Sequence, residues 1–316
     1  MKDEDRMRYS LPKMREVLRC PFIIQYSFSA AIASGEVVRV SVNNGIRVAA
    51  VTQKANESLA FSPISKKSCD SLIMSLISEN LQAVHQAIAQ AAQRFGRNPT
   101  DIALLAVSKT FPAEDVLKAW QAGQSAFGEN YVQEAVEKIA QVDALLAQQT
   151  APDLNTETKI EWHFIGPIQS NKTRLIAEHF AWVHSIERDK IAHRLSEQRP
   201  LDLPDLNVCL QVNISGEASK SGVSPDQCLE LARYVRALPR LRLRGLMAVP
   251  EATEDETQQR QAFAALRRLA EELRHDGIEL DTLSMGMSAD LTAAIAEGST
   301  MVRIGSAIFG KRNYAV

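Results

Sequence analysis

The sequence predicts an α/β protein built around a single (β/α)8 barrel, the TIM-barrel architecture. From residue 74 onward, eight short apolar runs alternate with amphipathic stretches of helical spacing. Alternation of this kind indicates parallel strands joined by right-handed helical crossovers. Eight such units within about 250 residues match the size of a closed barrel. A doubly wound open sheet is the alternative, although no G-x-G-x-x-G motif follows the first run.

Each element follows from this periodicity. An opening helix is predicted where Ile77, Leu81, Val84 and Ile88 recur at helical spacing, and it should end near Gly96. Strands are expected at residues 102–107, 125–127, 161–165, 181–185, 206–213, 241–247, 281–285 and 301–304. Helices are expected between them at residues 112–122, 131–148, 172–180, 188–198, 225–238, 257–275 and 289–297.

Residues 1–73 differ from the rest of the chain. The first part is charged, residues 21–51 are patchily apolar, and residues 52–70 are polar enough to be interpreted as a linker. Interspersed charges spoil the apolar core that a secretory signal needs. The predicted organisation is therefore an N-terminal extension over residues 1–73, either disordered or an over-extended reading frame before Met74, and a barrel over residues 74–316.

Composition excludes several classes of protein. The chain has 45% hydrophobic and 23% charged residues with a formal net charge of −2, which argues against nucleic acid or an anionic membrane as the main partner. No apolar run is long enough to predict a membrane span. The four cysteines are widely spaced, which suggests free thiols in a reducing cytoplasm and no metal site. We expect a monomer, because no exposed apolar helix face stands out.

Lys109 is the residue most suggestive of chemistry. The run at residues 102–107 is entirely apolar, as in a strand covered on both faces, and Ser108 and Lys109 follow it. Apolar walls around a lysine at the end of such a strand would lower its pKa. The neutral amine could then attack a carbonyl and form a Schiff base. The alternative is a lysine that simply extends its ammonium group into water.

The loops after the last two strands predict an anion site. Barrels often hold phosphate there, and small residues let backbone N–H groups approach the anion closely. The candidate residues of these loops are Ser284, Gly286, Ser288, Arg303, Gly305 and Ser306. Arg303 adds positive charge, or else is a solvated ion-pair partner.

The first and eighth strands of a closed barrel are neighbours, so Lys109 and the anion site should face the same cavity. A phosphate site beside a Schiff-base lysine suggests a phosphorylated aldehyde, either pyridoxal 5′-phosphate (PLP) or a sugar phosphate in a class I aldolase. An aldolase would need acid and base partners. Glu129 is the obvious carboxylate, although a glutamate at a helix start also favours the helix dipole.

Three further residues have two interpretations each. Asn130 either caps a helix before Tyr131 or contacts the cofactor. His163 is either a packed barrel histidine or a ligand or catalytic group. Lys220 lies in a loop rich in Ser and Gly and is either a solvated charge or a mobile acceptor of transferred aldehyde.

Motifs along the chain resemble those of the pyridoxal phosphate homeostasis protein family, in the same order from about Met74 to the C-terminus. They are Ala106-Val107-Ser108-Lys109, Phe127-Gly128-Glu129-Asn130, Trp162-His163-Phe164-Ile165-Gly166, Ser219-Lys220-Ser221-Gly222, Gly245-Leu246-Met247, Ser284-Met285-Gly286-Met287-Ser288 and Val302-Arg303-Ile304-Gly305. Residues 1–73 have no counterpart in that pattern.

The resemblance implies a barrel similar to the N-terminal domain of alanine racemase, with PLP on Lys109 and phosphate contacts around Ser288 and Gly305. It also implies a role in vitamin B6 homeostasis, with apo PLP-dependent enzymes as candidate recipients, rather than turnover of a defined substrate. Independently, racemisation needs a base on each face of the ligand. The chain ends at Val316 without room for the second domain that supplies one in alanine racemase, so we expect no enzymatic activity and no catalytic residues. The alternative is a fold-type III PLP enzyme, such as an amino-acid racemase that a partner completes.

Overall fold

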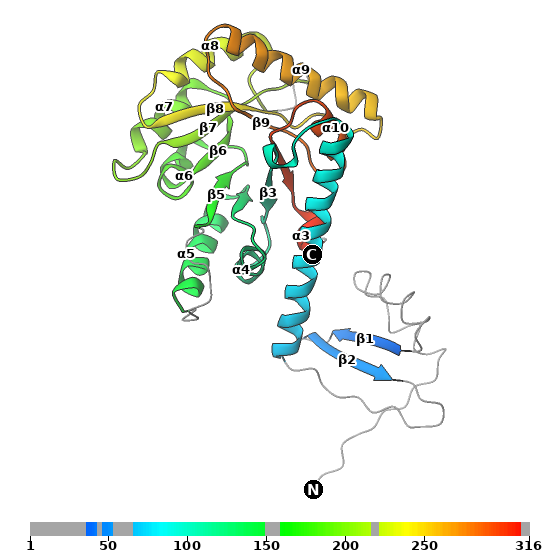
Figure 1. The fold of residues 1–316 in the computed structure, drawn as a ribbon. Coiled ribbons are helices and arrows are strands. Elements are labelled where there is room, and N and C mark those ends of the chain that lie inside the picture. The colour runs from blue at the N-terminus through cyan, green and yellow to red at the C-terminus, as the bar shows by residue number, and fades with distance from the viewer. Residues whose placement is uncertain (1–35, 43–45, 53–65, 149–158, 216–220, 311–316) are drawn as a thin grey trace. The chain divides into compact units, whose positions relative to one another are not determined.

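The computed structural model describes residues 36–42, 46–52, 66–148, 159–215 and 221–310 (Figure 1). Contacts within the chain divide it into two units, Met1–Ile73 and Met74–Val316. Each unit is considered by itself below.

Eight parallel strands close into a barrel in the second unit, in the order β10-β3-β4-β5-β6-β7-β8-β9. Closure depends on the pairing of the last strand with the first, in which Ile304 lies beside Ala106. The predicted barrel is therefore confirmed, and the open-sheet alternative is wrong. The strands are β3 (Ala103–Val107), β4 (Ala126–Glu129), β5 (Glu161–Phe164), β6 (Trp182–Ile186), β7 (Leu206–Gln211), β8 (Leu241–Met247), β9 (Thr282–Ser284) and β10 (Met301–Ile304).

Helices separate consecutive strands and form the outer layer, as Figure 1 shows for α5 to α9 around the strands. They are α4 (Ala113–Gln121), α5 (Val132–Gln148), α6 (Thr173–His179), α7 (Asp189–Gln198), α8 (Pro225–Arg236), α9 (Glu256–His275) and α10 (Leu291–Ala296). The short α11 (Ser306–Phe309) follows β10. Single-turn 3₁₀ helices occur at Pro99–Asp101 and Ser170–Lys172. Each helix that was predicted between two strands is present within a few residues of its expected bounds.

The opening helix is longer than predicted. Helix α3 spans Lys66–Arg94, so the linker interpretation of residues 52–70 is wrong for its last five positions. The amphipathic pattern begins only near Ile77, but once a helix has nucleated each further residue adds a hydrogen bond at low cost. The mostly polar residues 66–71 therefore extend the helix without any periodic signal of their own.

A β-hairpin occupies part of the first unit and was not predicted. Strand β1 (Glu36–Val42) pairs antiparallel with β2 (Ile46–Thr52), with Glu36 opposite Thr52 and Val42 opposite Ile46. Valine alternates with polar residues in β1, and Asn44-Gly45 follows it, which is a strong hairpin signal. Glu36, Arg39 and Arg47 interrupt the apolar residues of this segment and weaken its period-two pattern.

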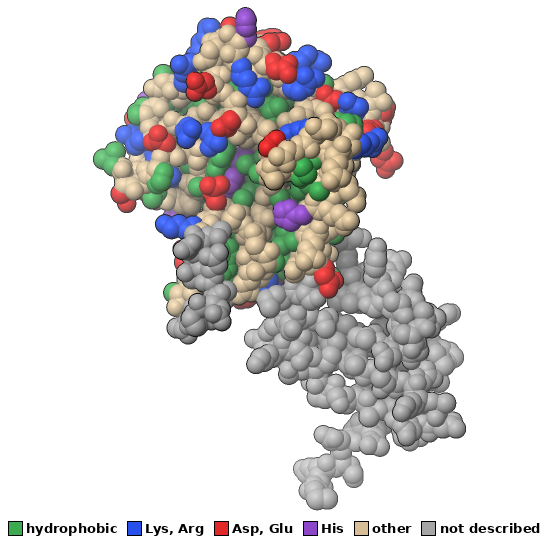
Figure 2. All heavy atoms as spheres, in the orientation of Figure 1, with side chains coloured by type: hydrophobic (Ala, Val, Ile, Leu, Met, Phe, Trp, Pro, Cys, Tyr) green, Lys and Arg blue, Asp and Glu red, His purple; other side chains and the backbone are tan. Residues whose placement is uncertain are grey.

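Large apolar side chains fill both layers of the barrel wall. Leu105, Phe127, Phe164 and Leu246 are fully buried. Burial of one such side chain stabilises the folded state by about 1.5–3 kcal/mol. The packed strands therefore form a stable support for the loops at their ends. Figure 2 shows acidic and basic side chains interspersed over the drawn face. No helix in the described part of the chain is both long and apolar enough to cross a membrane.

Candidate functional site

Alternation along the strands sorts their side chains between the interior of the barrel and the helix layer. A Cβ atom added to Gly128 would lie 3.2 Å from Ile165 and 3.3 Å from Leu105, so these three positions share one side. Ser108 and Glu129 lie on the other side, where they meet Lys138 of α5. Because the helices cover the outside of a barrel, the Leu105 side is the interior.

Lys109 follows β3 directly and continues the Leu105 side of the alternation, so its side chain starts from the inner side. It is half-buried. The next residue, Thr110, has φ +66°, a left-handed conformation that is costly for a β-branched side chain. The backbone thus turns sharply immediately after the lysine. The Thr110 N–H donates to Glu134 Oε1 at 2.6 Å, which holds this turn.

A buried ion pair supports the Lys109 loop from the helix side. Lys138 Nζ donates to Glu129 Oε1 at 2.7 Å, to the Ser108 carbonyl at 2.8 Å and to Glu134 Oε1 at 3.1 Å. Ser108 Oγ also donates to Glu129 Oε1, at 2.7 Å. Burial raises the pKa of the Glu129 carboxyl, and the neighbouring Lys138 opposes that shift. Glu129 therefore serves this outer network, and the carboxylate that an aldolase interpretation needs is turned away from the interior.

The Asn130 side chain carries an unsatisfied polar atom. Its Oδ1 is buried and accepts no hydrogen bond in the structure. The amide oxygen therefore does not cap α5, which removes one of the two interpretations of this residue. Asn130 lies on the interior side of β4, two positions after Gly128. An orphaned acceptor at the ligand end of a barrel fits a polar group that binds there.

The loop after β9 turns on a glycine that no other residue could replace without strain. Gly286 has φ +98°, and an added Cβ would lie 2.5 Å from the Cβ of Ala294 in α10. Its carbonyl accepts from the Arg303 N–H at 2.9 Å, which joins the start of this loop to β10. Asp290 Oδ1 accepts from the Met287 N–H at 2.5 Å and closes the turn around exposed Ser288. Burial raises the pKa of the Asp290 carboxyl.

The loop after β10 lies against the loop that carries Lys109. An added Cβ on Gly305 would lie 3.0 Å from the Val107 carbonyl, two residues before the lysine. The ring centroids of Phe111 and Phe309 are 5.1 Å apart, which joins the Lys109 loop to α11. Ser306 begins α11 and is exposed. The loop after β3 that carries Lys109 is the lysine loop, and the loop after β10 with Gly305 and Ser306 is the small-residue loop. The structure thus brings these two loops together at the same mouth of the barrel.

Arg303 lies deeper than the other predicted anion ligands. Its guanidinium is buried and donates from Nη1 to the carbonyl and, at 2.9 Å, to the hydroxyl of Ser284. Nη2 donates to the Ala248 carbonyl at 2.9 Å. Burial lowers the pKa of Arg303 to about 10, so the group remains charged at neutral pH. Its charge therefore belongs to the barrel interior, with Ser284 as its immediate partner.

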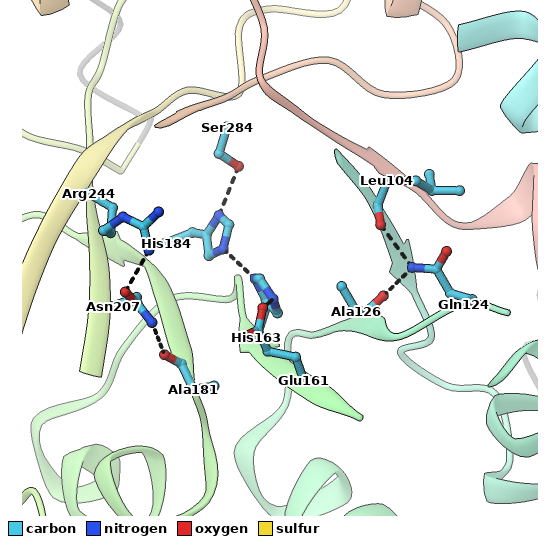
Figure 3. Close-up of polar contacts among 10 residues, drawn as sticks. All are labelled: Leu104, Gln124, Ala126, Glu161, His163, Ala181, His184, Asn207, Arg244 and Ser284. Atoms are coloured by element: carbon cyan, nitrogen blue, oxygen red, sulfur yellow. Dashed lines mark hydrogen bonds and ion pairs between the residues drawn. The ribbon is translucent and has the colours of Figure 1, made fainter. Parts of the chain in front are cut away.

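His163 is fully buried and forms part of a chain of polar groups inside the barrel (Figure 3). Its Nε2 lies 2.9 Å from Glu161 Oε1, and its Nδ1 lies 2.9 Å from His184 Nε2. His184 Nδ1 in turn lies 2.8 Å from Ser284 Oγ. His163 is thus a satisfied interior histidine, and the chain reaches the predicted site residue Ser284.

Two contributors escaped the sequence analysis. Lys138 would have been indicated by its i,i+4 spacing to Glu134 on an otherwise apolar helix face. His184 carries no local signal, because its partner is 100 residues away in sequence. Lys220 lies outside the described residues. Within the ranges that the structure describes, no group of three or more His, Cys, Asp or Glu side chains could hold a metal ion.

The geometry defines a barrel protein of the alanine racemase N-terminal domain class, and that family matches residues 80–313 of the chain. Pyridoxal phosphate homeostasis proteins of Pseudomonas aeruginosa and Escherichia coli are 57% and 52% identical to it over 241 and 246 residues. These alignments cover 76% and 77% of the chain and 98% and 99% of the relatives. The chain belongs to the pyridoxal phosphate homeostasis protein family.

Solved structures agree with this assignment. PipY of Synechococcus elongatus with PLP bound is 33% identical, with a TM-score of 0.61 over 74% of the chain and all of PipY. Alanine racemase of Corynebacterium glutamicum is 17% identical, with a TM-score of 0.56 over 77% of the chain and 63% of the racemase. The second likeness shows the shared barrel fold alone.

Proposed function

We propose that this chain binds pyridoxal 5′-phosphate and acts in PLP homeostasis, holding the aldehyde as a Schiff base on Lys109. The observation that carries the proposal is the contact between the lysine loop and the small-residue loop, seen in the 5.1 Å approach of Phe111 to Phe309. The names of the family relatives and the PLP-bound PipY structure support the choice of ligand.

The residues present fit this cofactor. Asn130 Oδ1 is a buried acceptor without a partner, as a site for a polar ring substituent requires. Gly286 and Gly305 are closely packed, since an added Cβ would lie 2.5 Å from Ala294 and 3.0 Å from the Val107 carbonyl. With Ser288 and Ser306 they provide the small residues that a phosphate bound by backbone N–H groups requires. Arg303 supplies a buried positive charge behind these loops, held in place by Ser284.

Bound PLP would supply an electron sink, and the chain's own residues supply position. The Lys109 amine would condense with the aldehyde and release one water. The outer network of Lys138, Glu129 and Glu134 holds the Ser108–Thr110 backbone, so the lysine projects from a fixed turn. Binding rather than turnover is the function that this arrangement supports.

We also propose that the chain is not an enzyme. Racemisation requires bases on both faces of the ligand. His163 and His184 are both committed to hydrogen bonds with each other and with neighbouring groups. An assay of amino-acid racemisation by the purified chain tests this, and measurable turnover would overturn it. The monomeric state, the cytoplasmic location and the supply of PLP to apo PLP-dependent enzymes remain predictions.

Absorption spectroscopy tests the binding proposal. The purified protein mixed with PLP should show a visible band that Lys109→Ala abolishes. Lys118→Ala is a matched control, because Lys118 lies in the next helix and pairs with Asp115 instead. An unchanged band in Lys109→Ala, or a wild-type protein without any band, would contradict the proposal.

A further inference from the structure

A hydrogen-bonded chain crosses the barrel interior from one mouth to the other (Figure 3). It starts at Glu161, the first residue of β5 and therefore at the N-terminal mouth, and its carboxylate contacts His163. His163 contacts His184, and His184 contacts Ser284 at the C-terminal end of β9. Arg303 ends the chain by donating to Ser284 Oγ.

The two ends fix the direction of every bond between them. A guanidinium can only donate, and Arg303 stays charged because its pKa, although lowered by burial, is about 10. An ionised carboxylate can only accept. The hydrogen bond from His163 holds the pKa of Glu161 below its usual value, so this carboxyl is ionised at neutral pH.

The groups in the middle each accept once and donate once. Burial lowers the pKa of both histidines, so each ring carries a single N–H at neutral pH. His163 must then donate from Nε2 to Glu161 and accept at Nδ1. His184 must likewise carry its proton on Nε2, from which it donates to His163 Nδ1. Its own Nδ1 is then an acceptor, so the Ser284 hydroxyl must donate to it.

The Glu161 end is held by its own surroundings. The Trp182 ring stacks on His163 with centroids 5.3 Å apart, and the Trp182 side chain helps to hold the pKa of Glu161 below its usual value. The Arg244 guanidinium lies 4.7 Å from the Trp182 centroid and pairs with Asp281 at 2.8 Å. The positive charge of Arg244 also helps to hold the pKa of Glu161 below its usual value.

We propose that Glu161 is a positioning residue, which sets the tautomers of His163 and His184 and thereby the hydroxyl proton of Ser284 and the guanidinium of Arg303. Ser284 directs its proton towards His184 and so presents a lone pair to Arg303. The Arg303 N–H in turn donates to the Gly286 carbonyl at 2.9 Å. Gly286 lies in the loop after β9, which is predicted to contact the anion. The inference rests on the proposed function for the identity of the ligand that this mouth binds.

Nitrogen-15 NMR of the protein without PLP tests the chain directly. The sequence has six histidines, and His163→Asn and His184→Asn assign the two interior rings. Both rings should be neutral and protonated on Nε2 at neutral pH. A ring protonated on Nδ1 or on both nitrogens in the wild type would overturn the inference, even if every variant failed to fold.

Glu161→Gln tests the control exerted by the carboxylate. A glutamine can accept or donate, so the variant should populate Nδ1-protonated rings as well. Glu271→Gln is the matched control, since its side chain is 52% exposed, against 48% for Glu161, and its partner Arg267 lies on the same surface helix. Unchanged tautomers in Glu161→Gln would contradict the proposal.

The effect on the ligand is measured separately. Glu161→Gln should weaken PLP binding by about 2- to 10-fold, the factor that one net hydrogen bond is worth, and should shift the visible band, whereas Glu271→Gln should do neither. Unaltered affinity and band in Glu161→Gln would refute an action on the ligand. A wild-type protein without a visible band would refute the proposed function. The NMR experiment would still show whether Glu161 sets the tautomers of His163 and His184.

Discussion

Two buried polar networks lie on opposite sides of the same barrel wall, and they are built differently. The outer network is a local ion pair, in which Lys138 meets Glu129 nine residues away and braces the turn after β3. The inner network is a chain of single hydrogen bonds from Glu161 to Arg303, with one link across 100 residues of sequence. The outer network therefore holds the backbone beside Lys109, whereas the inner network sets proton positions.

The first prediction tests the difference between the two networks by removing Lys138 from the outer one. Lys138→Met leaves the buried Glu129 carboxylate without its cation, and breaking such a pair costs about 3–5 kcal/mol of unfolding free energy. Burial already raises the pKa of Glu129 in the folded state. The folded variant then binds more protons than the unfolded chain, so its stability should fall as the pH rises and recover in acid.

Chemical denaturation across pH 5 to about 8 measures this effect. The double variant Glu129→Gln/Lys138→Met is the control, because it removes both charges and should be less pH-dependent than the single variant. Equal stability of Lys138→Met and wild type at neutral pH would show that the outer pair is not a support of the fold.

The second prediction concerns the loop after β9, which the inner network reaches through the hydrogen bond from the Arg303 N–H to the Gly286 carbonyl. Gly286→Ala should lose about 2–4 kcal/mol, from the positive φ and from overlap with the Ala294 methyl group, and should weaken PLP binding. Gly277→Ala has a similar φ of +79° but nothing within 4 Å of the added Cβ, so it should lose only about 1–2 kcal/mol and bind PLP normally. Thermal melts and PLP titrations of the two variants measure the difference, and equal losses would indicate that close packing at Gly286 is unimportant.

The third prediction sharpens the contrast at the outer end of the inner chain. Glu161 is half-exposed, so Glu161→Gln should change the unfolding free energy by less than about 1 kcal/mol despite its effect on the interior tautomers. Denaturant titration beside Lys138→Met compares the two networks. A loss as large as that of Lys138→Met would mean that the inner chain also acts mainly as a structural support.

The smallest expected effect is at Thr110. Its φ of +66° is strained for threonine, and Thr110→Gly should relieve this at some cost in chain entropy, for a net gain below about 1 kcal/mol. The N–H that donates to Glu134 is retained. A melt of this variant should therefore shift upward slightly, and a clear loss of stability would show that the turn is not strained by its side chain.

The barrel could be predicted from the sequence because its strands are apolar runs and its helices have a clear period. The proximity of Lys109 to the loop at residues 303–306 could also be predicted, since the last and first strands must pair in a closed barrel. The loop at residues 284–288 follows the neighbouring strand β9. The start of α3 at Lys66 could not be predicted, because a polar extension of a helix has no periodic signal.

The complete networks could not be predicted, because most of their contacts join residues from different helices and strands. Glu129 looked like a candidate acid beside Lys109, yet strand alternation turns it towards Lys138. Glu161 lies two residues before His163, but the other members of this chain, His184 and Ser284, come from other strands. The contacts of Arg303 with Ser284 and Ala248 also join residues that are far apart in sequence.

Reduction of the PLP-loaded protein with borohydride, followed by peptide mapping, tests the central claim most directly. Reduction converts a lysine–aldehyde linkage into a stable amine, so the modified lysine can be identified by mass. A Schiff base on Lys109 should leave a pyridoxyl phosphate adduct on the peptide that contains Lys109, and none on the peptide that contains Lys138. An adduct on another lysine with Lys109 unmodified would contradict it.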